Sequence, residues 1–306
     1  MRCGYSYGLA LGLLLWSGSL YAEPPRTYPQ EGPQHFLGLD DTSAPAQLKD
    51  GRSSDLQNVS LGISYDLRQR YGYKVIGDTA DIPDEAFCAV TGLYATTFAS
   101  GTTRNIRTCA NRFEYLSGTD WVLVPGGIAN ITGGQNNQFV WTTALDNIIG
   151  TNNVNIPVRW PGGTTDALVP VSFTGLTNAI TVAKAVAFFK NYLIFGQTTE
   201  NSLLYPTRIR WANVGYINTW TDADYIDIDA QSGQELVALV PLADSLYAFF
   251  TSSIYRISLV GGSQTFQISR ISDRFGSIAK NSIQSIFLQN GQSVLAFLDK
   301  SKRIYY

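Results

Sequence analysis

Histidine is almost absent from this chain of 306 residues, which contains one, His35, and only three cysteines. Catalytic sites of the Ser-His-Asp or Cys-His type need an imidazole as general base. His35 lies in a proline-rich stretch without a neighbouring cysteine or carboxylate cluster, as is typical of a solvated loop histidine. The patterns Cys-x-x-Cys, His-x-x-x-His and Gly-x-x-x-x-Gly-Lys are also missing. The sequence therefore argues against zinc, nucleotide and triad chemistry, and no cofactor is expected.

Charged residues are scarce as well, at 15% of the chain against roughly 25% in soluble domains. The 24 acidic residues outnumber the 22 basic ones, so the net charge is −2. This balance predicts no electrostatic surface for nucleic acid or anionic lipid. With 28 glycines and 12% aromatic residues, the composition favours many short strands joined by tight turns over helices.

The amino terminus has the layout of a secretory signal peptide at residues 1–22. Arg2 is positively charged, Leu9 to Trp16 is an apolar run too short to span a bilayer, and Ser-Leu-Tyr-Ala offers a cleavage site after it. Cleavage would leave a mature chain without a membrane span. An uncleaved anchor and a start codon placed too early are the alternatives. A leader with four prolines follows at residues 23–35.

Cys88 and Cys109 would be the only pair left after such cleavage, because Cys3 lies inside the signal. In an oxidising compartment they could form a disulfide. The alternative is two unpaired, half-buried thiols, because a single pair in a sequence does not determine the geometry that a disulfide needs.

Residues 87–306 contain a unit of four short strands that can be written five times, the last without its fourth strand. Turns rich in Gly, Asn and Ser separate the strands. An aromatic residue recurs on the third strand of each unit at spacings of about 45 to 50 residues, as Tyr115, Trp160, Trp211, Tyr255 and Tyr305. Blades of a β-propeller have this length and strand number, and the aromatic residue is predicted to pack between successive sheets.

We therefore predict an all-β fold, a β-propeller of about five repeated four-stranded antiparallel blades that is incomplete at the carboxyl end. A β-sandwich or an irregular β-solenoid is the alternative, since both also have a strand about every 8 to 12 residues. Residues 36–86 are predicted to be a β segment that contributes to ring closure. One of its strands, Val59 to Ile63 or Leu67 to Arg70, would complete the fifth blade. Otherwise the chain is a fragment with blades missing.

Carboxylates cluster at one place in the chain, as Asp222, Asp224, Asp227 and Asp229. They are a weak candidate site for Ca²⁺, which prefers several oxygen ligands, or for the paired carboxylates of glycoside hydrolysis. The simpler interpretation is an outermost strand whose charges prevent wrong pairing. Strand alternation places Arg208 and Arg210 opposite Ile209, where they are predicted to pair with Asp227 and Asp229.

The order of these elements resembles the β-propeller virion proteins of tailed bacteriophages, among them the tail nozzle of short-tailed phages. The resemblance covers roughly Phe36 to the end of the chain. Its most specific part is Arg208-Ile-Arg-Trp-Ala-Asn213, followed by Thr219-Trp220 and Asp227-Ile-Asp229. The other motifs are Phe36-Leu-Gly-Leu39, Leu48-Lys-Asp-Gly51, Leu56-Gln-Asn-Val59, Arg68-Gln-Arg-Tyr-Gly72 and Arg112-Phe-Glu-Tyr-Leu-Ser-Gly118.

The resemblance implies a virion protein of the phage tail that is not an enzyme. Such proteins stack as symmetric rings at the end of the tail tube, through which DNA passes. It therefore implies a homo-oligomer that contacts other tail proteins and does not recognise a nucleic-acid sequence. An exported bacterial propeller, periplasmic or secreted, that binds a carbohydrate or a protein partner is the alternative. An exported hydrolase using Asp227 and Asp229 is the third hypothesis.

Overall fold

The computed structural model describes residues 90–109, 111–127, 131–134, 136–230, 233–262 and 264–306, together with four short strands nearer the amino terminus. The chain divides into two compact units, Met1–Lys74 and Val75–Tyr306. The predicted signal at residues 1–22 and the predicted leader at residues 23–35 lie outside the described residues. In the part that is described, no helix is long and apolar enough to cross a membrane.

The first unit contains two small sheets. Strands β1 (Gly38–Leu39) and β2 (Arg52–Ser53) pair in parallel, whereas β3 (Val59–Leu61) and β4 (Leu67–Gln69) form an antiparallel hairpin. The two strand candidates for completing the fifth blade thus pair with one another. Ring closure by residues 36–86 stays a prediction.

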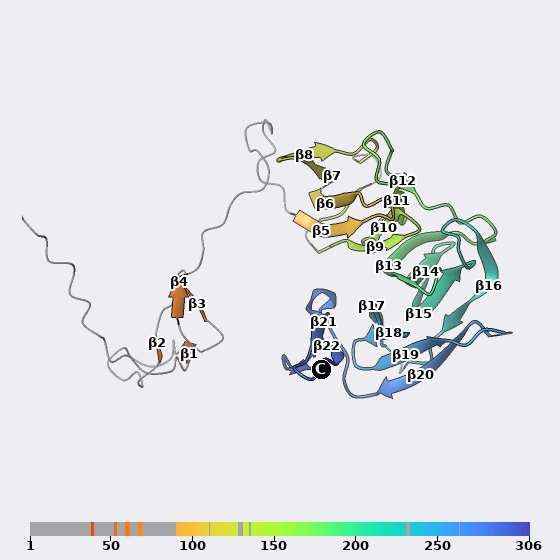
Figure 1. Cartoon of the computed structure of the whole chain (residues 1–306). Helices are drawn as coiled ribbons and strands as arrows, with labels where there is room; N and C mark the ends of the chain where they lie inside the picture. Colours follow the sequence, from red (N-terminus) through yellow and green to blue (C-terminus); the bar gives the residue numbers. More distant parts are fainter. Residues whose placement is uncertain are drawn as a thin grey trace, which may run out of the picture. The chain divides into compact units, whose positions relative to one another are not determined.

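The second unit is a five-bladed β-propeller, which confirms the predicted fold class over the sandwich and the solenoid (Figure 1). Within each blade, strands that follow one another in the chain are neighbours in the sheet. Blade 1 consists of β5 (Val90–Thr97), β6 (Thr103–Cys109), β7 (Arg112–Ser117) and β8 (Asp120–Leu123). Blade 2 consists of β9 (Val140–Ala144), β10 (Asn147–Thr151), β11 (Val158–Trp160) and β12 (Val169–Pro170).

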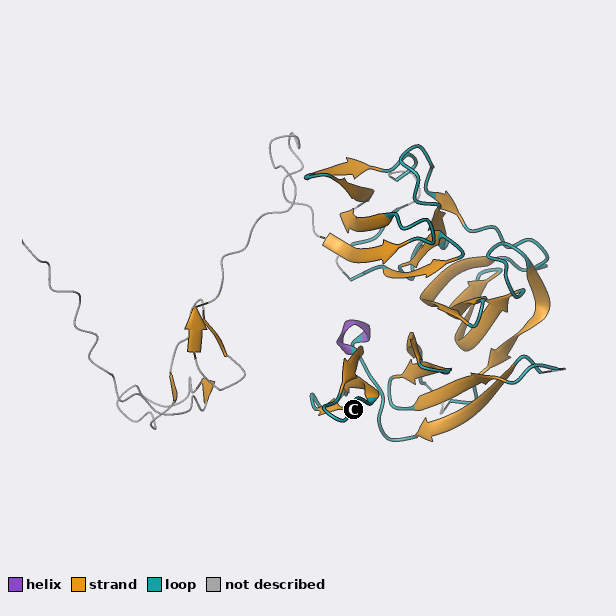
Figure 2. Ribbon diagram, viewed as in Figure 1, coloured by secondary structure: helices purple, strands orange, loops and turns teal. Residues whose placement is uncertain are grey.

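The remaining blades follow the same order. Blade 3 consists of β13 (Ile180–Phe189), β14 (Tyr192–Glu200), β15 (Leu203–Ala212) and β16 (Trp220–Asp227). Blade 4 consists of β17 (Leu236–Leu242), β18 (Ser245–Phe250), β19 (Ile254–Leu259) and β20 (Phe266–Ser272). Blade 5 has three strands, β21 (Gln284–Phe287), β22 (Ser293–Leu298) and β23 (Ile304–Tyr305). Figure 2 shows one short helix before β21, the 3₁₀ turn η2 (Lys280–Ser282).

Several hairpins are closed by two-residue turns in which both residues have positive φ. They are Leu145-Asp146, Lys190-Asn191 and Asn201-Ser202. Two consecutive residues with positive φ form a type I′ turn, whose twist matches that of the flanking strands. The residues asparagine and aspartate tolerate this conformation well, because their short side chains bond to the local backbone. Short turns of this kind keep each blade a simple up-and-down sheet.

Buried apolar residues form four clusters, one at each seam between successive blades. Ring contacts cross these seams. Tyr115 of blade 1 lies 5.5 Å from Trp160 of blade 2, and Trp211 of blade 3 lies 5.0 Å from Phe266 of blade 4, measured between ring centroids. A four-stranded sheet cannot bury its apolar faces alone, so each blade depends on its neighbours.

Candidate functional site

The most extensive polar network of the described chain lies in blade 3, in the segment that the sequence singles out. On β15, Ile209 packs into the core between blades 3 and 4. Arg208 and Arg210 point to the opposite face, because side chains alternate along a strand. That face is turned toward blade 2, since Arg210 stands opposite Phe195, which belongs to the core between blades 2 and 3.

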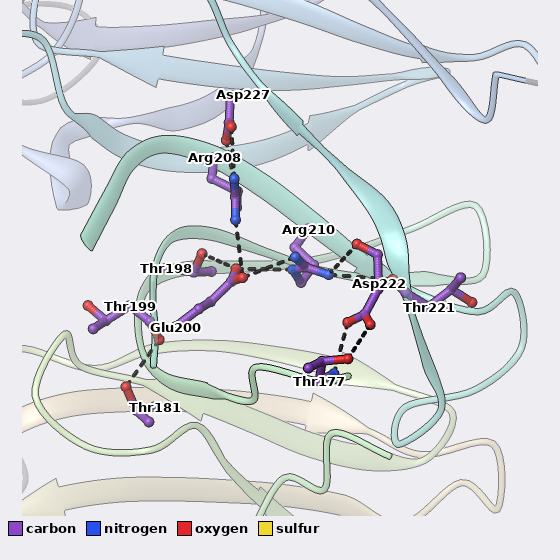
Figure 3. A network of polar contacts seen from close by, with 10 residues as sticks. All are labelled: Thr177, Thr181, Thr198, Thr199, Glu200, Arg208, Arg210, Thr221, Asp222 and Asp227. Carbon is purple, nitrogen blue, oxygen red and sulfur yellow. Dashed lines mark hydrogen bonds and ion pairs between the residues drawn. The ribbon is translucent and has the colours of Figure 1, made fainter. Parts of the chain in front are cut away.

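Glu200, at the end of β14, accepts hydrogen bonds from both arginines (Figure 3). Arg210 donates from Nε and Nη2 at 3.0 Å each, and Arg208 donates from Nη1 at 3.1 Å. The hydroxyl of Thr198 donates to the same carboxylate at 2.8 Å. Glu200 is only 3% exposed, so these bonds replace the water that its charge loses on burial.

Arg208 also pairs with Asp227 of the neighbouring strand β16. Its Nε and Nη2 donate to the two carboxylate oxygens of Asp227 at 2.7 and 2.8 Å, a bidentate arrangement. The guanidinium carbon lies 3.5 Å from the ring centroid of Tyr205 and 3.9 Å from that of Tyr225. Burial opposes the charged form of Arg208, but its bonds and charge attraction to Asp227 and Glu200 raise its pKa above the ordinary value.

Arg210 completes the network by binding backbone. Its Nη1 donates to the carbonyl oxygens of Thr221 and Asp222, at 3.4 and 3.2 Å. The Asp222 carboxylate accepts from the backbone amide and the hydroxyl of Thr177, which lies in the connection between blades 2 and 3. These bonds lower the pKa of Asp222. The network therefore ties β14, β15 and β16 together and links them to the preceding connection.

The predicted pairing is confirmed for Arg208 with Asp227 and is wrong for Arg210, which binds Glu200 instead. Asp229 lies past the end of β16, and its backbone carbonyl accepts from the hydroxyl of Tyr255 in blade 4. Sequence reasoning missed Glu200, because alternation along one strand does not show which carboxylate of the neighbouring strand lies beside its arginines. The signal that could have found it is Asn201-Ser202, a turn pair that extends the hairpin so that Glu200 stands opposite Leu203.

The four aspartates of the weak calcium candidate do not converge. Asp222 binds Thr177 and Asp227 binds Arg208, while burial raises the pKa of Asp224. Among the residues that the structure describes, no group of three or more His, Cys, Asp or Glu side chains is placed to hold a metal ion. Three of the four lie on β16, which is the outermost strand of blade 3 as the simpler interpretation predicts.

Blade 1 carries a counterpart of the blade 3 network. Glu114 on β7 accepts from Nε of Arg107 at 2.6 Å and from Nε of Arg112 at 2.9 Å. The guanidinium of Arg107 lies 4.5 Å from the ring of Trp121 on the outermost strand β8. Both blades thus combine one buried glutamate, two arginines and an aromatic residue of the fourth strand. The glutamate lies on the third strand in blade 1 and on the second strand in blade 3.

The aromatic residues that mark the repeat lie on the third strand of their blades. Four are buried, and Tyr305 is half-buried, as follows: Tyr115 on β7, Trp160 on β11, Trp211 on β15, Tyr255 on β19 and Tyr305 on β23. Cys109 is buried and disulfide-bonded. Cys88 and His35 lie outside the described residues, so the pairing of Cys88 with Cys109 stays a prediction.

The face of blade 1 that points away from blade 2 is partly apolar. Tyr94 and Thr96 of β5 bond to Thr143 of blade 2, so Leu93 and Ala95 point the other way. Leu93 is 71% exposed. A hollow of about 350 Å³ on this side is lined by Leu93, Tyr94, Ala95, Asn105, Leu116 and Trp121. We call Leu93, Ala95, Leu116 and Trp121 the blade 1 face.

The face of blade 5 that points away from blade 4 is also apolar. Leu295 and Phe297 of β22 pack into the core with blade 4, so Val294, Ala296 and Leu298 point the other way. Their strand neighbours Ile286 and Ile304 stand opposite Val294 and Leu298, and Ile304 is 75% exposed. We call Ile286, Val294, Ala296, Leu298 and Ile304 the blade 5 face.

Two further hollows lie beside blade 4. One of about 470 Å³ at the seam of blades 3 and 4 is lined by Ile226, Asp227, Ile228, Asp229, Tyr255, Ile268 and Arg270. Another of about 500 Å³ lies between blades 4 and 5, and its walls are mainly aromatic and aliphatic, including Phe249, Phe275 and Phe297. The first combines charged and apolar groups, whereas the second resembles an apolar groove.

No family model matches the sequence, and no curated protein matches it. The fold is similar to several solved structures. BBS1N, crystallised in complex with ARL6DN, has a TM-score of 0.45 and 9% identity, over 76% of this chain and 67% of that one. The computationally designed Ika8 protein has a TM-score of 0.38 and 13% identity, over 72% and 71% of the chains. The N-terminal domain of Nup159 has a TM-score of 0.37 and 9% identity, over 70% of this chain and 61% of that one.

Proposed function

We propose that this chain is a non-enzymatic structural protein that assembles into a ring through inter-subunit contacts, as a nozzle or tube-end component of a phage tail. The observation that carries the proposal is the exposure of large apolar side chains on the first and last blades, Leu93 at 71% and Ile304 at 75%, because exposed apolar patches on a folded protein typically mark protein-protein contacts. The phage tail assignment rests on the sequence resemblance, whose most specific motif forms β15 and the start of β16.

Two other features agree with a structural role. In the ion networks of blades 1 and 3 the buried glutamates accept hydrogen bonds from arginines of the same blade, so these bonds hold neighbouring strands together. The chain has few basic residues, which suits the lining of a tube through which DNA passes without being retained.

Negative-stain electron microscopy of the purified full chain, combined with light scattering after gel filtration, tests the proposal. We expect ring-shaped particles of several subunits and a gene neighbourhood that encodes portal and capsid proteins. A monomer at tens of micromolar concentration, together with efficient export and cleavage after residue 22, would contradict it.

The second candidate is an exported propeller that binds a carbohydrate or a protein partner. The hollow at the seam of blades 3 and 4 favours it, because Asp227, Asp229 and Arg270 offer polar groups beside Tyr255 and two isoleucines. Titration of the monomeric protein with a panel of oligosaccharides in a calorimeter would test it. Binding that is lost in Arg270→Ala and kept in Arg256→Ala, an exposed arginine of the adjacent strand, would support this function.

A further inference from the structure

The outermost strand of each four-stranded blade is the edge of its sheet, and the four edges differ. Strand β12 has two residues and ends in Pro170, β8 has four residues, and β16 carries three aspartates. Short length, proline and charge are features that keep an edge strand from pairing with another chain. Strand β20 has seven residues, Phe-Gln-Ile-Ser-Arg-Ile-Ser, with one charged side chain, Arg270. It is therefore the least protected of the four edges.

The backbone of β20 directs hydrogen-bonding groups away from its blade. The amide of Val260 donates to the carbonyl of Thr265, at the turn that joins β19 to β20. Backbone groups alternate in direction along an antiparallel strand, so every second residue after Thr265 also faces β19, and the groups of Ile268 and Arg270 face outward. Strand β20 is the last of its sheet, and no other described strand pairs with it. An extended segment laid along β20 would thus meet backbone donors and acceptors that have no strand partner.

The side chains of β20 alternate between the two hollows beside blade 4. Phe266 and Ile268 pack against the core shared with blade 3, and Arg270 lines the hollow of about 470 Å³ at that seam. Ile271, which is 55% exposed, lines the apolar hollow of about 500 Å³ between blades 4 and 5, together with Phe275, which is 40% exposed. A strand added beside β20 would alternate its own side chains between the same two sides. It would therefore reach both hollows.

The two hollows favour different side chains. The side chain of Arg270 is exposed, and no ion pair or hydrogen bond joins it to another residue of the described chain. Asp227 lines the same hollow, but its carboxylate is already held by Arg208. An acidic side chain opposite Arg270 on an added strand would form a cross-strand ion pair. On the other side of β20, the aromatic and aliphatic walls of the apolar hollow favour a large apolar side chain.

We propose that β20 is the docking edge for an extended segment of a partner protein, which adds to blade 4 as a fifth strand. The segment alternates large apolar residues, which enter the hollow between blades 4 and 5, with polar residues that include an acidic one opposite Arg270. In this mode of recognition, backbone bonds supply affinity and alternating pockets supply specificity. The inference goes beyond ring assembly and does not depend on it, because one chain carries the edge and both hollows. For the second candidate function, it selects a protein partner over a carbohydrate.

A displayed library of short random peptides, selected on the purified full chain, supplies the probes. We expect the selected peptides to alternate apolar and polar residues and to carry a glutamate or aspartate between two apolar residues. Synthetic copies N-methylated at alternate amides test backbone pairing. Methylation of one alternate set should weaken binding by about tenfold or more, because those amides would bond to β20, whereas methylation of the other set should leave the dissociation constant unchanged. Equal effects of the two sets would contradict strand addition.

Substitutions on the two sides of β20 locate the bound peptide. Arg270→Glu should weaken binding of an acidic peptide by about tenfold or more, and binding should return when lysine replaces the acidic residue of the peptide. Ile271→Asp should weaken both peptides, because it places a carboxylate beside the apolar hollow. Arg256→Glu is the matched control, since Arg256 is exposed on the adjacent strand β19 and lines neither hollow. Unchanged thermal unfolding would show that the substituted chains fold.

The outcomes separate this inference from ring assembly. Peptides that keep their affinity for Arg270→Glu and Ile271→Asp would overturn it, and so would a selection that yields no binder. A parent chain that binds no peptide and forms a dimer that Arg270→Glu dissociates would also overturn it, because a second copy would then occupy the edge. Each of these results leaves ring assembly to its own test of particle size and shape. Loss of binding in both variants, with recovery by the lysine peptide and retention in Arg256→Glu, is the result that we expect.

Discussion

At the scale of single residues, Glu200 is the centre of the blade 3 network, because it compensates two buried arginines. Glu200→Gln would leave Arg208 and Arg210 facing a neutral group at a buried site. We expect a loss of about 3 to 5 kcal/mol in the free energy of unfolding, the usual cost of breaking a buried ion pair. Urea denaturation followed by tryptophan fluorescence would measure it.

The same substitution at Glu235 is the control. Glu235 pairs with Lys184 at 3.1 Å, but its side chain is 51% exposed. Pairs of that kind contribute about 0 to 1 kcal/mol, since water solvates either partner when the other is removed. Equal losses in Glu200→Gln and Glu235→Gln would contradict the central position of Glu200.

Asp222 offers a residue-scale prediction that depends on pH. Its pKa is lowered mainly by the hydroxyl of Thr177 and next by the backbone amide of that residue. Thr177→Val removes the first bond and keeps the second, so we expect the pKa of Asp222 to rise part of the way to its ordinary value. The pKa of Asp222 is lower in the folded chain than in the unfolded chain. The bonds from Thr177 to Asp222 therefore stabilise the fold fully above the ordinary pKa of an aspartate, and this stabilisation is lost as the pH falls through the pKa of the folded chain.

NMR titration of the carboxyl carbons would follow Asp222 directly. Thr181→Val is a suitable control, since the hydroxyl of Thr181 donates to the carbonyl of Thr199 rather than to an aspartate. An unchanged pKa of Asp222 in Thr177→Val would mean that the backbone bond alone accounts for the shift.

At the scale of elements, Gly150 on β10 illustrates how closely strands pack in blade 2. It stands opposite Trp141 of β9, and a Cβ atom at Gly150 would lie 1.9 Å from Cζ3 of that ring. The ring stacks on Phe139 at 4.7 Å between centroids and contacts Phe113 of blade 1 at 5.2 Å. Gly150→Ala must therefore displace the ring, and we expect a loss of about 2 kcal/mol or more in unfolding free energy.

Gly134→Ala controls for the change of glycine to alanine itself, because a Cβ atom there would meet nothing within 4 Å. We expect it to change stability by less than about 0.5 kcal/mol. The double variant Trp141→Leu/Gly150→Ala should lose less than the sum of its single changes, since the two residues contact one another. Additive losses measured by urea denaturation would refute the steric explanation.

Much of the blade architecture could be predicted from strand periodicity, and the exceptions have physical reasons. The third-strand aromatics Trp160 and Trp211 were placed correctly because their spacing follows the repeat. The start of the fourth strand of blade 3 could not be predicted, because a register shift after Arg210 brings Trp220 opposite Ala212. Local pattern cannot reveal such a bulge. Glu200 was missed as the partner of Arg210 because its position beside the arginine depends on where the turn between β14 and β15 lies.

At the scale of the whole propeller, the beginnings of several blades are joined by polar side chains. Lys280 and Asn281, before blade 5, donate to Gln138, before blade 2. Lys184 of blade 3 pairs with Glu235, before blade 4. Lys184 also lies close enough to Lys280 to oppose its positive charge. The contact of blade 5 with blade 2 is therefore made by a lysine whose charge is disfavoured.

Burial, and next the charge of Lys184, lower the pKa of Lys280 from 10.5 to about 8. Between these values the unfolded chain binds more protons at this residue than the folded chain does, so this lysine makes stability rise with pH in that window. Lys280→Met removes the side-chain amine that binds this proton. We expect the stability of the parent relative to Lys280→Met to increase from about pH 7.5 to about pH 10, as measured by urea denaturation at each pH. Lys300→Met, at an exposed lysine of blade 5, is the matched control for the change of lysine to methionine. Parallel curves for Lys280→Met and the parent would show that the charge of Lys280 is not disfavoured at the contact between blades 5 and 2.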